Sequence, residues 1–307
     1  MVYLTISIDV EPDCTPTWKY SNPLTFSGVL IGIKERLQPL FNEYDITPAY
    51  LLNNVVMENE ESVDVFKKLN DSCELGTHLH AEFIEPAKEF SDYAGKQGVR
   101  NQCYLDKEIE FGKMESLTKL FEKCFGYHPR SFRAGRFSAG ANTINCLERL
   151  GYIVDTSVTP HVKWKDKSRE KPVNYRGAPE QPFFCNEKRW LRPKQDGKIL
   201  EIPVSIISKN NFPRSGRPVW LRPVYSDLKQ LIGVCDFLRA KYLKKNGLCV
   251  LNMMFHNVEV VPNKSPYSQT EEVCQEYLQM LSNFFSYCKS EGFVSKTLSE
   301  IAQVYRV

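Results

Sequence analysis

Two histidines two positions apart, His78 and His80, stand in the stretch Glu74-Leu-Gly-Thr-His-Leu-His-Ala-Glu-Phe83. Side chains at positions i and i+2 of an extended chain point to the same side, so both imidazoles can reach one metal ion. Imidazole nitrogens are common ligands of zinc and related ions. Taken alone, such a pair more often belongs to a surface turn that happens to carry two histidines.

A group of carboxylates at the amino terminus favours the metal interpretation. The run Asp9-Val-Glu-Pro-Asp13 directly follows a stretch rich in β-branched residues, which predicts a strand that ends in an acidic loop. The period of two places Asp9 and Glu11 on the same side of that strand. Their carboxylate oxygens can join the histidine nitrogens at such a metal site. Asp13 is a weaker candidate because Pro12 redirects the chain before it.

Further polar residues follow other predicted strands, namely Arg133, Asp155 and His256. Each has an ordinary structural explanation, such as a helix cap, a surface charge or a buried hydrogen-bonded histidine. In a (β/α) barrel, however, the carboxyl ends of the strands form the face on which active sites are built. A single site explains these positions better than several unrelated explanations do.

Strands and helices alternate along the chain about eight times. The predicted strands are residues 3–8, 47–52, 73–80, 131–135, 152–157, 200–206 and 248–255, with a last one near 293. The predicted helices are residues 33–44, 60–69, 107–125, 141–150, 226–245 and 270–289, followed by a terminal helical turn. Such alternation predicts an α/β fold with parallel strands and helices outside. A distorted (β/α) barrel of seven or eight units fits this pattern better than a doubly wound sheet.

Residues 1–307 form one predicted domain, because no linker or internal repeat interrupts the alternation. The exception is a long Pro-rich insertion at residues 163–222, which carries 15 Lys or Arg against 6 Asp or Glu. Long segments of this kind in a compact domain are usually functional rims or lids. The positive charge favours a substrate that carries phosphates, while a merely solvated charged loop is the alternative.

The overall composition is that of an ordinary globular protein, with 42% hydrophobic and 25% charged residues. A net charge of +3 gives no argument for nucleic-acid binding. No stretch is long and apolar enough for a membrane span, and the first residues lack the basic region of a signal peptide. The expected location is therefore the cytoplasm.

The ordered motifs resemble those of the NodB-type polysaccharide deacetylases, carbohydrate esterase family 4. Within that family the chain is most similar to the WalW-like branch, which is associated with lipopolysaccharide and capsule biosynthesis. The resemblance rests on Ser7-Ile-Asp-Val-Glu-Pro-Asp13, Gly76-Thr-His-Leu-His-Ala-Glu-Phe83, Ser131-Phe-Arg-Ala-Gly-Arg136, Gly151-Tyr-Ile-Val-Asp-Thr-Ser-Val-Thr-Pro-His161, Leu251-Asn-Met-Met-Phe-His256 and Ser265-Pro-Tyr267. It implies a distorted (β/α) barrel and a metal-dependent carbohydrate N-deacetylase.

The resemblance also implies a metal site. Asp9 corresponds to the catalytic base and Glu11 to the carboxylate ligand, with Asp13 as an alternative. His78 matches the first histidine ligand, but Glu82 stands where the second is usual, four positions later. We expect His80 to complete the site, with Glu82 as the alternative. The implied ion is zinc, with cobalt, manganese or nickel as substitutes.

Other roles follow from the same resemblance. Arg133 corresponds to an arginine that clamps the catalytic aspartate, and Asp155 and His256 correspond to a pair in which the histidine is the general acid. Arg136 replaces an aromatic residue of the family pattern and is a candidate for binding an anionic group, with a surface salt bridge as the alternative. Trp164 is a candidate for stacking on the sugar.

The expected reaction is hydrolysis of the N-acetyl group of an amino sugar, in which the metal activates water and Asp9 removes its proton. The expected substrate is a precursor of a surface polysaccharide such as O-antigen or capsule, linked to a nucleotide or a lipid pyrophosphate. Two alternatives are another metal-dependent amidohydrolase on the same barrel and a catalytically silent barrel that binds glycan. The oligomeric state cannot be predicted from the sequence.

Overall fold

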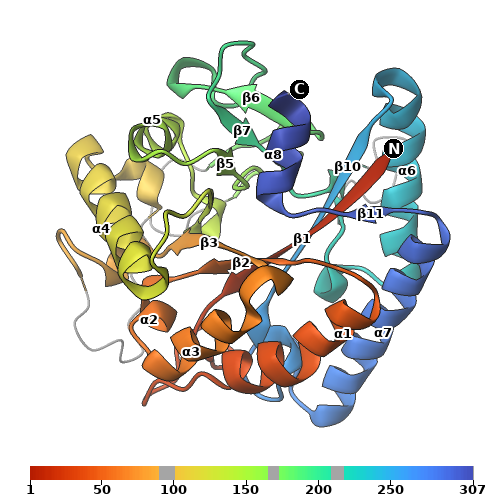
Figure 1. Cartoon of the computed structure of the whole chain (residues 1–307), viewed down its shortest axis with the longest axis horizontal. Helices are drawn as coiled ribbons and strands as arrows, with labels where there is room; N and C mark the ends of the chain where they lie inside the picture. Colours follow the sequence, from red (N-terminus) through yellow and green to blue (C-terminus); the bar gives the residue numbers. More distant parts are fainter. Residues whose placement is uncertain (90–100, 165–172, 209–217, 307) are drawn as a thin grey trace.

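A curled sheet occupies the centre of the molecule, and helices surround its outside (Figure 1). The computed structural model describes residues 1–89, 101–164, 173–208 and 218–306. Its strands are β1 (Val2–Val10), β2 (Ala49–Leu52), β3 (Glu74–Leu79), β4 (Ser131–Ala134), β5 (Val154–Asp155), β6 (Phe183–Cys185), β7 (Ile199–Glu201), β8 (Ile206–Ile207), β9 (Val219–Trp220), β10 (Cys249–His256) and β11 (Val294–Ser295).

The helical segments follow the expected pattern closely. They are η1 (Gly28–Leu37), α1 (Gln38–Glu43), α2 (Asn54–Met57), α3 (Glu60–Leu69), α4 (Lys107–Phe125), α5 (Ala141–Leu150), α6 (Leu228–Asn246), α7 (Glu271–Ser290) and α8 (Leu298–Arg306). Helices α4 and α5 end at Gly126 and Gly151, whose left-handed conformation caps each helix. The predicted helix 33–44 falls within two consecutive segments, because Pro39 lies in the first turn of α1.

The strand order in the main sheet is β10-β1-β2-β3-β4-β5-β7-β6, with β11 beside β1. The described pairs are parallel except for β6, which runs antiparallel to β7. Parallel strands connected through outer helices place all their carboxyl ends on one face. The predicted α/β fold with a curled parallel sheet is confirmed.

The two ends of the curled sheet, β10 on one side and the β7–β6 pair on the other, approach each other without a regular ladder in the described part of the chain. The backbone N–H of Ser205 donates to the carbonyl of Asn252 at 3.0 Å, and the N–H of Asn252 donates to Ser205 Oγ at 2.8 Å. The side chain of Gln181 makes two hydrogen bonds, of 2.8 and 2.9 Å, to the backbone of Val250. Side chains and irregular backbone thus close what a further strand would close in a regular barrel.

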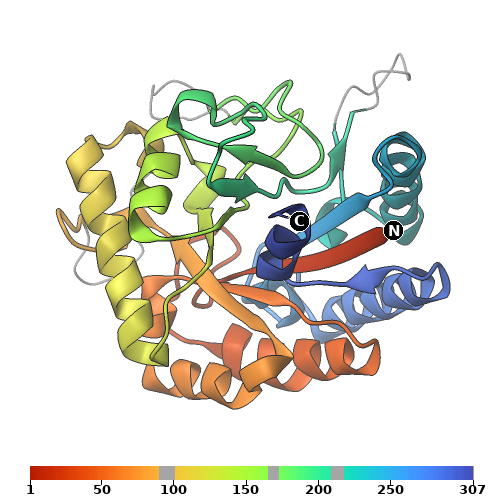
Figure 2. The same cartoon turned by 45° about the horizontal axis from the view of Figure 1, so that its top comes forward.

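Helix α8 fills the amino-terminal end of the barrel. Its buried residues Leu298, Ile301 and Ala302 pack against the inward-facing side chains of Leu51 and Val154. Figure 2 shows this last helix, in dark blue, lying between the strands near the chain terminus. A larger apolar core lies between the sheet and the outer helices. The opposite, carboxyl-terminal face remains available for polar residues.

The basic segment 163–222 is only partly a rim. It contributes β6 and β7 to the barrel wall and the separate β8–β9 pair, while residues 165–172 and 209–217 lie outside the described part. The predicted strand 200–206 is divided, because β7 stops at Glu201, shortly before Pro203, which has no N–H for a ladder. Across the described residues, no helix combines the length and apolar character that a membrane crossing requires.

Candidate metal centre and active site

The carboxylates of the first motif and the last histidine are neighbours because β1 and β10 pair in register. Asp9 on β1 is paired with His256 on β10. Glu11 follows β1 directly, and its backbone is held on both sides by one amide: Asn257 Oδ1 accepts its N–H at 2.9 Å and Asn257 Nδ2 donates to its carbonyl at 3.0 Å. The acidic run therefore continues straight past the strand and stays at the carboxyl-terminal face.

The histidine pair comes from β3 and the residue after it. His78 pairs in register with Arg133 on β4. His80 follows the strand, and its ring lies against Gly135, where an added Cβ would press on the carbonyl oxygen of Leu79 and lie 2.8 Å from His80 Cδ2. A residue with a side chain at position 135 would therefore displace the imidazole.

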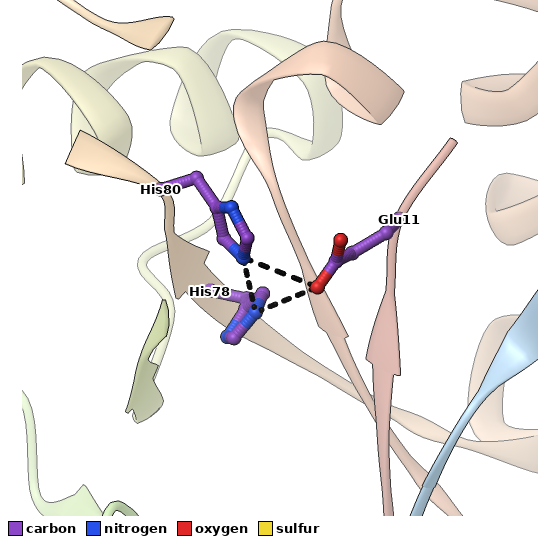
Figure 3. Close-up of side chains that lie close together, drawn as sticks. All are labelled: Glu11, His78 and His80. Carbon is purple, nitrogen blue, oxygen red and sulfur yellow. Dashed lines mark hydrogen bonds and ion pairs between the residues drawn. The ribbon is translucent and has the colours of Figure 1, made fainter. Parts of the chain in front are cut away.

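Glu11, His78 and His80 bring three potential ligand atoms together (Figure 3). Glu11 Oε1 lies 3.3 Å from His78 Nε2 and 3.1 Å from His80 Nε2, and the two histidine nitrogens are 3.2 Å apart. A tetrahedral zinc with bonds of about 2.0–2.1 Å separates its ligand atoms by roughly 3.3–3.4 Å. The three buried atoms thus fit a divalent cation in both spacing and chemistry.

The orientation of His78 suits this role. Its Nδ1 lies 3.0 Å from the carbonyl oxygen of Arg133, which can only accept a hydrogen bond. The proton therefore sits on Nδ1, and the lone pair of Nε2 faces the other two ligand atoms. Burial alone lowers the pKa of His78, but the adjacent Asp9 and Glu11 carboxylates outweigh it and hold the pKa above its usual value.

Glu11 is ionised in this environment. Burial alone raises the pKa of its carboxyl, but His80 and His78 beside it hold the pKa well below its usual value. A buried carboxylate next to two imidazole nitrogens is a ligand set typical of catalytic zinc sites that keep one position open.

Asp9 lies beside the three ligand residues, and Arg133 fixes it there. Arg133 Nη1 donates to Asp9 Oδ1 at 2.6 Å, and the guanidinium also bonds to Ser7 Oγ at 2.6 Å and to the carbonyl of Thr156 at 2.9 Å. Burial alone raises the pKa of Asp9, but Arg133, His78 and His256 together lower it. The free oxygen, Oδ2, lies 4.0 Å from His78 Nε2 and 3.9 Å from His256 Nε2.

The expected pairing of His256 with Asp155 is wrong. His256 Nδ1 lies 2.9 Å from Glu259 Oε1, in the turn η8 (Asn257–Val260) that follows β10. Glu259 also accepts a 2.7 Å bond from Arg222, and Arg222 with His256 outweighs the effect of burial and lowers the pKa of Glu259. An ionised Glu259 therefore orients the imidazole, and its Nε2 faces Glu11 Oε1 at 3.8 Å.

Asp155 lies elsewhere in the barrel interior. Its Oδ1 accepts a hydrogen bond from Ser157 Oγ at 2.5 Å, and it is fully buried. Burial raises the pKa of Asp155 to about 6, and it raises the pKa of the neighbouring Glu201 as well. Asp155 therefore belongs to the buried polar interior of the barrel. It does not supply the negative charge that would support a general-acid histidine.

The two alternative ligands are bound by other partners. Glu82 is fully buried in a two-pronged ion pair with Arg136, and one of its oxygens lies 3.9 Å from His80 Nδ1. Asp13 accepts hydrogen bonds from Thr25 Oγ1 at 2.6 Å and from Gly28 N–H at 2.8 Å. Among the described residues, the three-ligand set contains His80 and neither Glu82 nor Asp13.

The two expected substrate contacts stand apart from the ligand set. Both terminal nitrogens of Arg136 bind Glu82, so its guanidinium is already neutralised. Trp164 is half-buried, stacks on Phe137 with ring centres 5.5 Å apart, and donates from Nε1 to Thr159 Oγ1 at 3.0 Å. These contacts are those of a loop anchor.

Several residues around the site were not predicted from the sequence. Glu259 stands three positions after His256, a spacing that a turn brings together and that a search for turn contacts could have found. The Tyr20 hydroxyl contacts Glu11 and His80, and Asn53 donates to that hydroxyl; no periodicity reveals these hydrogen bonds. Trp18, held at a left-handed φ of 58°, places its ring 4.9 Å from that of His256.

Neither a protein-family model nor a curated protein matches this sequence. Solved structures do match. A candidate glycoside hydrolase or deacetylase from Parabacteroides distasonis is 13% identical and has a TM-score of 0.69, with 99% of this chain and 71% of that chain covered. A candidate polysaccharide deacetylase from Mycobacterium smegmatis is 14% identical and has a TM-score of 0.57, with 99% and 90% covered.

The Puue allantoinase is similar to the same extent, with 14% identity, a TM-score of 0.57 and coverage of 98% of this chain and 89% of that chain. Identities this low establish a shared architecture and leave the reaction open. The chain therefore has the polysaccharide-deacetylase type of fold, a curled parallel α/β barrel that also occurs in an allantoinase.

Proposed function

We propose that this protein is a metal-dependent hydrolase that removes the N-acetyl group from an acetylated amino sugar. The observation that carries the proposal is the ligand set of Glu11, His78 and His80, with Asp9 and His256 next to it. Amide hydrolysis needs an activated water, a base for its proton and an acid for the leaving amine. We assign all three roles to residues on one face of the barrel.

Glu11, His78 and His80 would hold the ion, with zinc as the first choice and cobalt, manganese or nickel as substitutes. When bound, such an ion supplies Lewis-acid polarisation of the acetyl carbonyl and lowers the pKa of coordinated water. The remaining work falls to the side chains around it.

In this proposal Asp9 acts as the general base. Its Oδ1 is held by Arg133 at 2.6 Å, which leaves Oδ2 to take the proton of the attacking water. Since Arg133 keeps the pKa of Asp9 low, the carboxylate is ionised and ready to accept that proton. His256, oriented by Glu259 through Nδ1, presents Nε2 and can deliver a proton to the leaving amine. The products are acetate and the free amino sugar.

The aromatic residues near His256 support a sugar as the substrate. The leaving nitrogen is attached to a carbon of the sugar ring, so that ring must lie on the side of the general acid. Trp18 and Tyr267 stand there with ring centres 5.6 Å apart, and the half-exposed Tyr225 follows Tyr267 at 6.1 Å. Exposed aromatic faces beside a polar centre are suited to bind the apolar face of a sugar ring.

We extend the proposal to the carrier of the sugar. The excess of Lys and Arg in residues 163–222 supports a phosphate-bearing substrate, linked to a nucleotide or a lipid pyrophosphate. A surface-polysaccharide precursor of the O-antigen or capsule type, handled in the cytoplasm, has this chemistry. Within the described residues of the segment, Arg222 contacts the site, and Glu259 already neutralises it.

The shared fold of the allantoinase keeps a second candidate open, hydrolysis of another amide such as a cyclic ureide. The same residues could serve that reaction, since it needs the same base and acid. The two candidate reactions differ in the substrate that is hydrolysed. Zinc-loaded protein should therefore be incubated with acetylated monosaccharides, acetylated nucleotide sugars and allantoin. Release of acetate supports the proposal, whereas opening of the ureide ring alone favours the second candidate.

The role of Asp9 provides the internal test. Zinc-loaded Asp9→Asn should release acetate at a rate lower by about 100-fold or more, the usual contribution of a general base. Asp196→Asn is the matched control, because Asp196 is 73% exposed and forms an ion pair with the nearby Lys194. Equal rates for the wild type and Asp9→Asn would remove Asp9 from the mechanism, and a zinc-loaded wild type inactive on every substrate would leave the silent glycan-binding barrel.

A further inference from the structure

A short hairpin at residues 14–20 lies over the metal centre. Cys14 and Tyr20 form an antiparallel bridge, and the N–H of Thr15 donates to the carbonyl of Lys19 at 2.7 Å. The hairpin places the ring of Tyr20 deep in the protein, where it is 2% exposed. That ring stacks on Phe83 at 5.0 Å and on His80 at 6.2 Å, so its position does not depend on its hydroxyl group.

Asn53 determines the direction of the hydrogen bonds around that hydroxyl. It is the N-cap of α2, and its Oδ1 accepts the backbone N–H of Val56 at 3.0 Å. Of the two ends of an asparagine amide, only the oxygen can accept a hydrogen bond from a backbone N–H. This contact therefore fixes the positions of Oδ1 and Nδ2. The amide nitrogen therefore faces Tyr20 and donates to its hydroxyl oxygen at 2.9 Å.

The remaining bonds of Tyr20 follow from that direction. A phenol has one hydrogen to donate, and a carboxylate can only accept. The nearest carboxylate oxygen is Glu11 Oε2, 3.4 Å from the hydroxyl, so the O–H points there. The remaining lone pair of the hydroxyl oxygen then faces His80 Nδ1 at 3.5 Å and can accept a hydrogen bond from an N–H at that atom.

We propose that Tyr20 is a positioning residue of the metal centre, which holds His80 in the tautomer with its proton on Nδ1 and its lone pair on Nε2. Nε2 is the atom that faces His78 and Glu11. The inference rests on the proposed metal centre and goes beyond it, because it assigns the tautomer of one ligand to a side chain outside the ligand set. Partners of this kind typically change metal affinity by about 10- to 100-fold.

The two histidine ligands are oriented by different means. His78 uses the backbone carbonyl of Arg133, which no side-chain substitution removes. His80 uses a phenol that also contacts the second oxygen of Glu11. One hydroxyl group thus couples two of the three ligands, which makes Tyr20→Phe a probe of both.

The test is the zinc affinity of Tyr20→Phe, measured by competition with a chromophoric chelator. We expect it to fall by about 10- to 100-fold while the metal-free variant stays folded, because the stacked ring remains and only the bond from Asn53 is lost. The visible spectrum of the Co²⁺-loaded protein should change as well, which a purely structural role would not cause. Tyr50→Phe is the matched control, since Tyr50 is equally buried and donates one 2.9 Å bond to Gln38 away from the site. It should leave zinc affinity unchanged.

A folded Tyr20→Phe that binds zinc as tightly as the wild type would overturn the inference. If that variant does not fold, Asn53→Ser replaces it, because serine still caps α2 but loses the amide donor to Tyr20. Weakened zinc binding by Asn53→Ser supports the inference, and wild-type affinity refutes it. A wild-type protein that binds no zinc is a different result, which removes the proposed metal centre itself.

Discussion

Glu259 stands three positions after His256, and its Oε1 lies 2.9 Å from His256 Nδ1. Arg222 donates to the same oxygen at 2.7 Å. The carboxylate is fully buried and ionised, so it fixes the imidazole with Nδ1 as the proton donor to Glu259. The other ring nitrogen is left to face the metal centre. The orienting acid of this site thus comes from the turn after β10.

Glu259→Gln should therefore lower kcat. The amide removes the negative charge that fixes Nδ1 of His256 as the proton donor, and we expect a loss on the order of 100-fold with unchanged zinc content. Steady-state acetate release and elemental analysis measure the two quantities. Glu291→Gln, which alters an exposed ion pair with Arg239, serves as the control and should keep wild-type kcat. Wild-type kcat in Glu259→Gln would assign the orientation of His256 to another group.

The ionisation of Asp155 should make the free energy of unfolding depend on pH. Burial raises the pKa of its carboxyl in the folded protein from the usual 3.8 to about 6. Folding thus favours the protonated acid, and its stabilising contribution is complete below about pH 4 and lost as the pH rises to about 6. Asp155→Asn stays neutral, so it should gain stability relative to the wild type across that window. Urea unfolding of both proteins at several pH values measures the difference, and a constant difference would contradict the assignment.

The identity of the third ligand can be tested by two substitutions. His80→Ala removes Nε2 from the ligand set and should abolish stoichiometric zinc binding. Glu82→Gln breaks the buried ion pair with Arg136 but leaves all three ligand atoms, so zinc should still bind. Zinc per chain after dialysis is the measurement. The reverse pattern, with zinc lost only in Glu82→Gln, would make Glu82 the ligand.

Gly135 should be indispensable for the position of His80. An alanine there would place its Cβ 2.8 Å from the imidazole carbon Cδ2, so the ring must move. We expect Gly135→Ala to weaken zinc binding measurably. Gly233→Ala, inside α6, is the control. Among the described residues, no atom beyond its own helix backbone and chain neighbours lies within 4 Å of the Cβ that alanine would add there. It should leave zinc affinity intact and stabilise the protein by about 0.5–1 kcal/mol, as alanine does in a helix. Equal zinc affinity of the two variants would show that His80 tolerates the added methyl group.

The sequence was sufficient to predict much of the barrel and to single out the three residues of the candidate ligand set. Strand periodicity placed Asp9 with Glu11 and His78 with His80, because alternate side chains of a strand share one side. The partner of His256 was predicted wrongly. That contact depends on the path of the turn after β10, and a resemblance between motifs does not determine such a path.

The contribution of Tyr20 was missed for a related reason. It reaches the centre through a hairpin whose shape depends on backbone bonds between Thr15 and Lys19, and neither helical nor strand periodicity encodes such bonds. The requirement for Gly135 likewise arises from the approach of His80, which belongs to a different strand connection. Contacts between separate loops are set by the packed structure, so they could not be predicted from the order of residues.

The location of zinc in crystals of the zinc-loaded protein tests the central claim most directly. Anomalous scattering at the zinc edge should show one strong peak bonded to Glu11 Oε1, His78 Nε2 and His80 Nε2, with distances of about 2.0–2.2 Å. A peak bound by other residues, or none at these three atoms in a protein that carries one zinc per chain, would contradict the account.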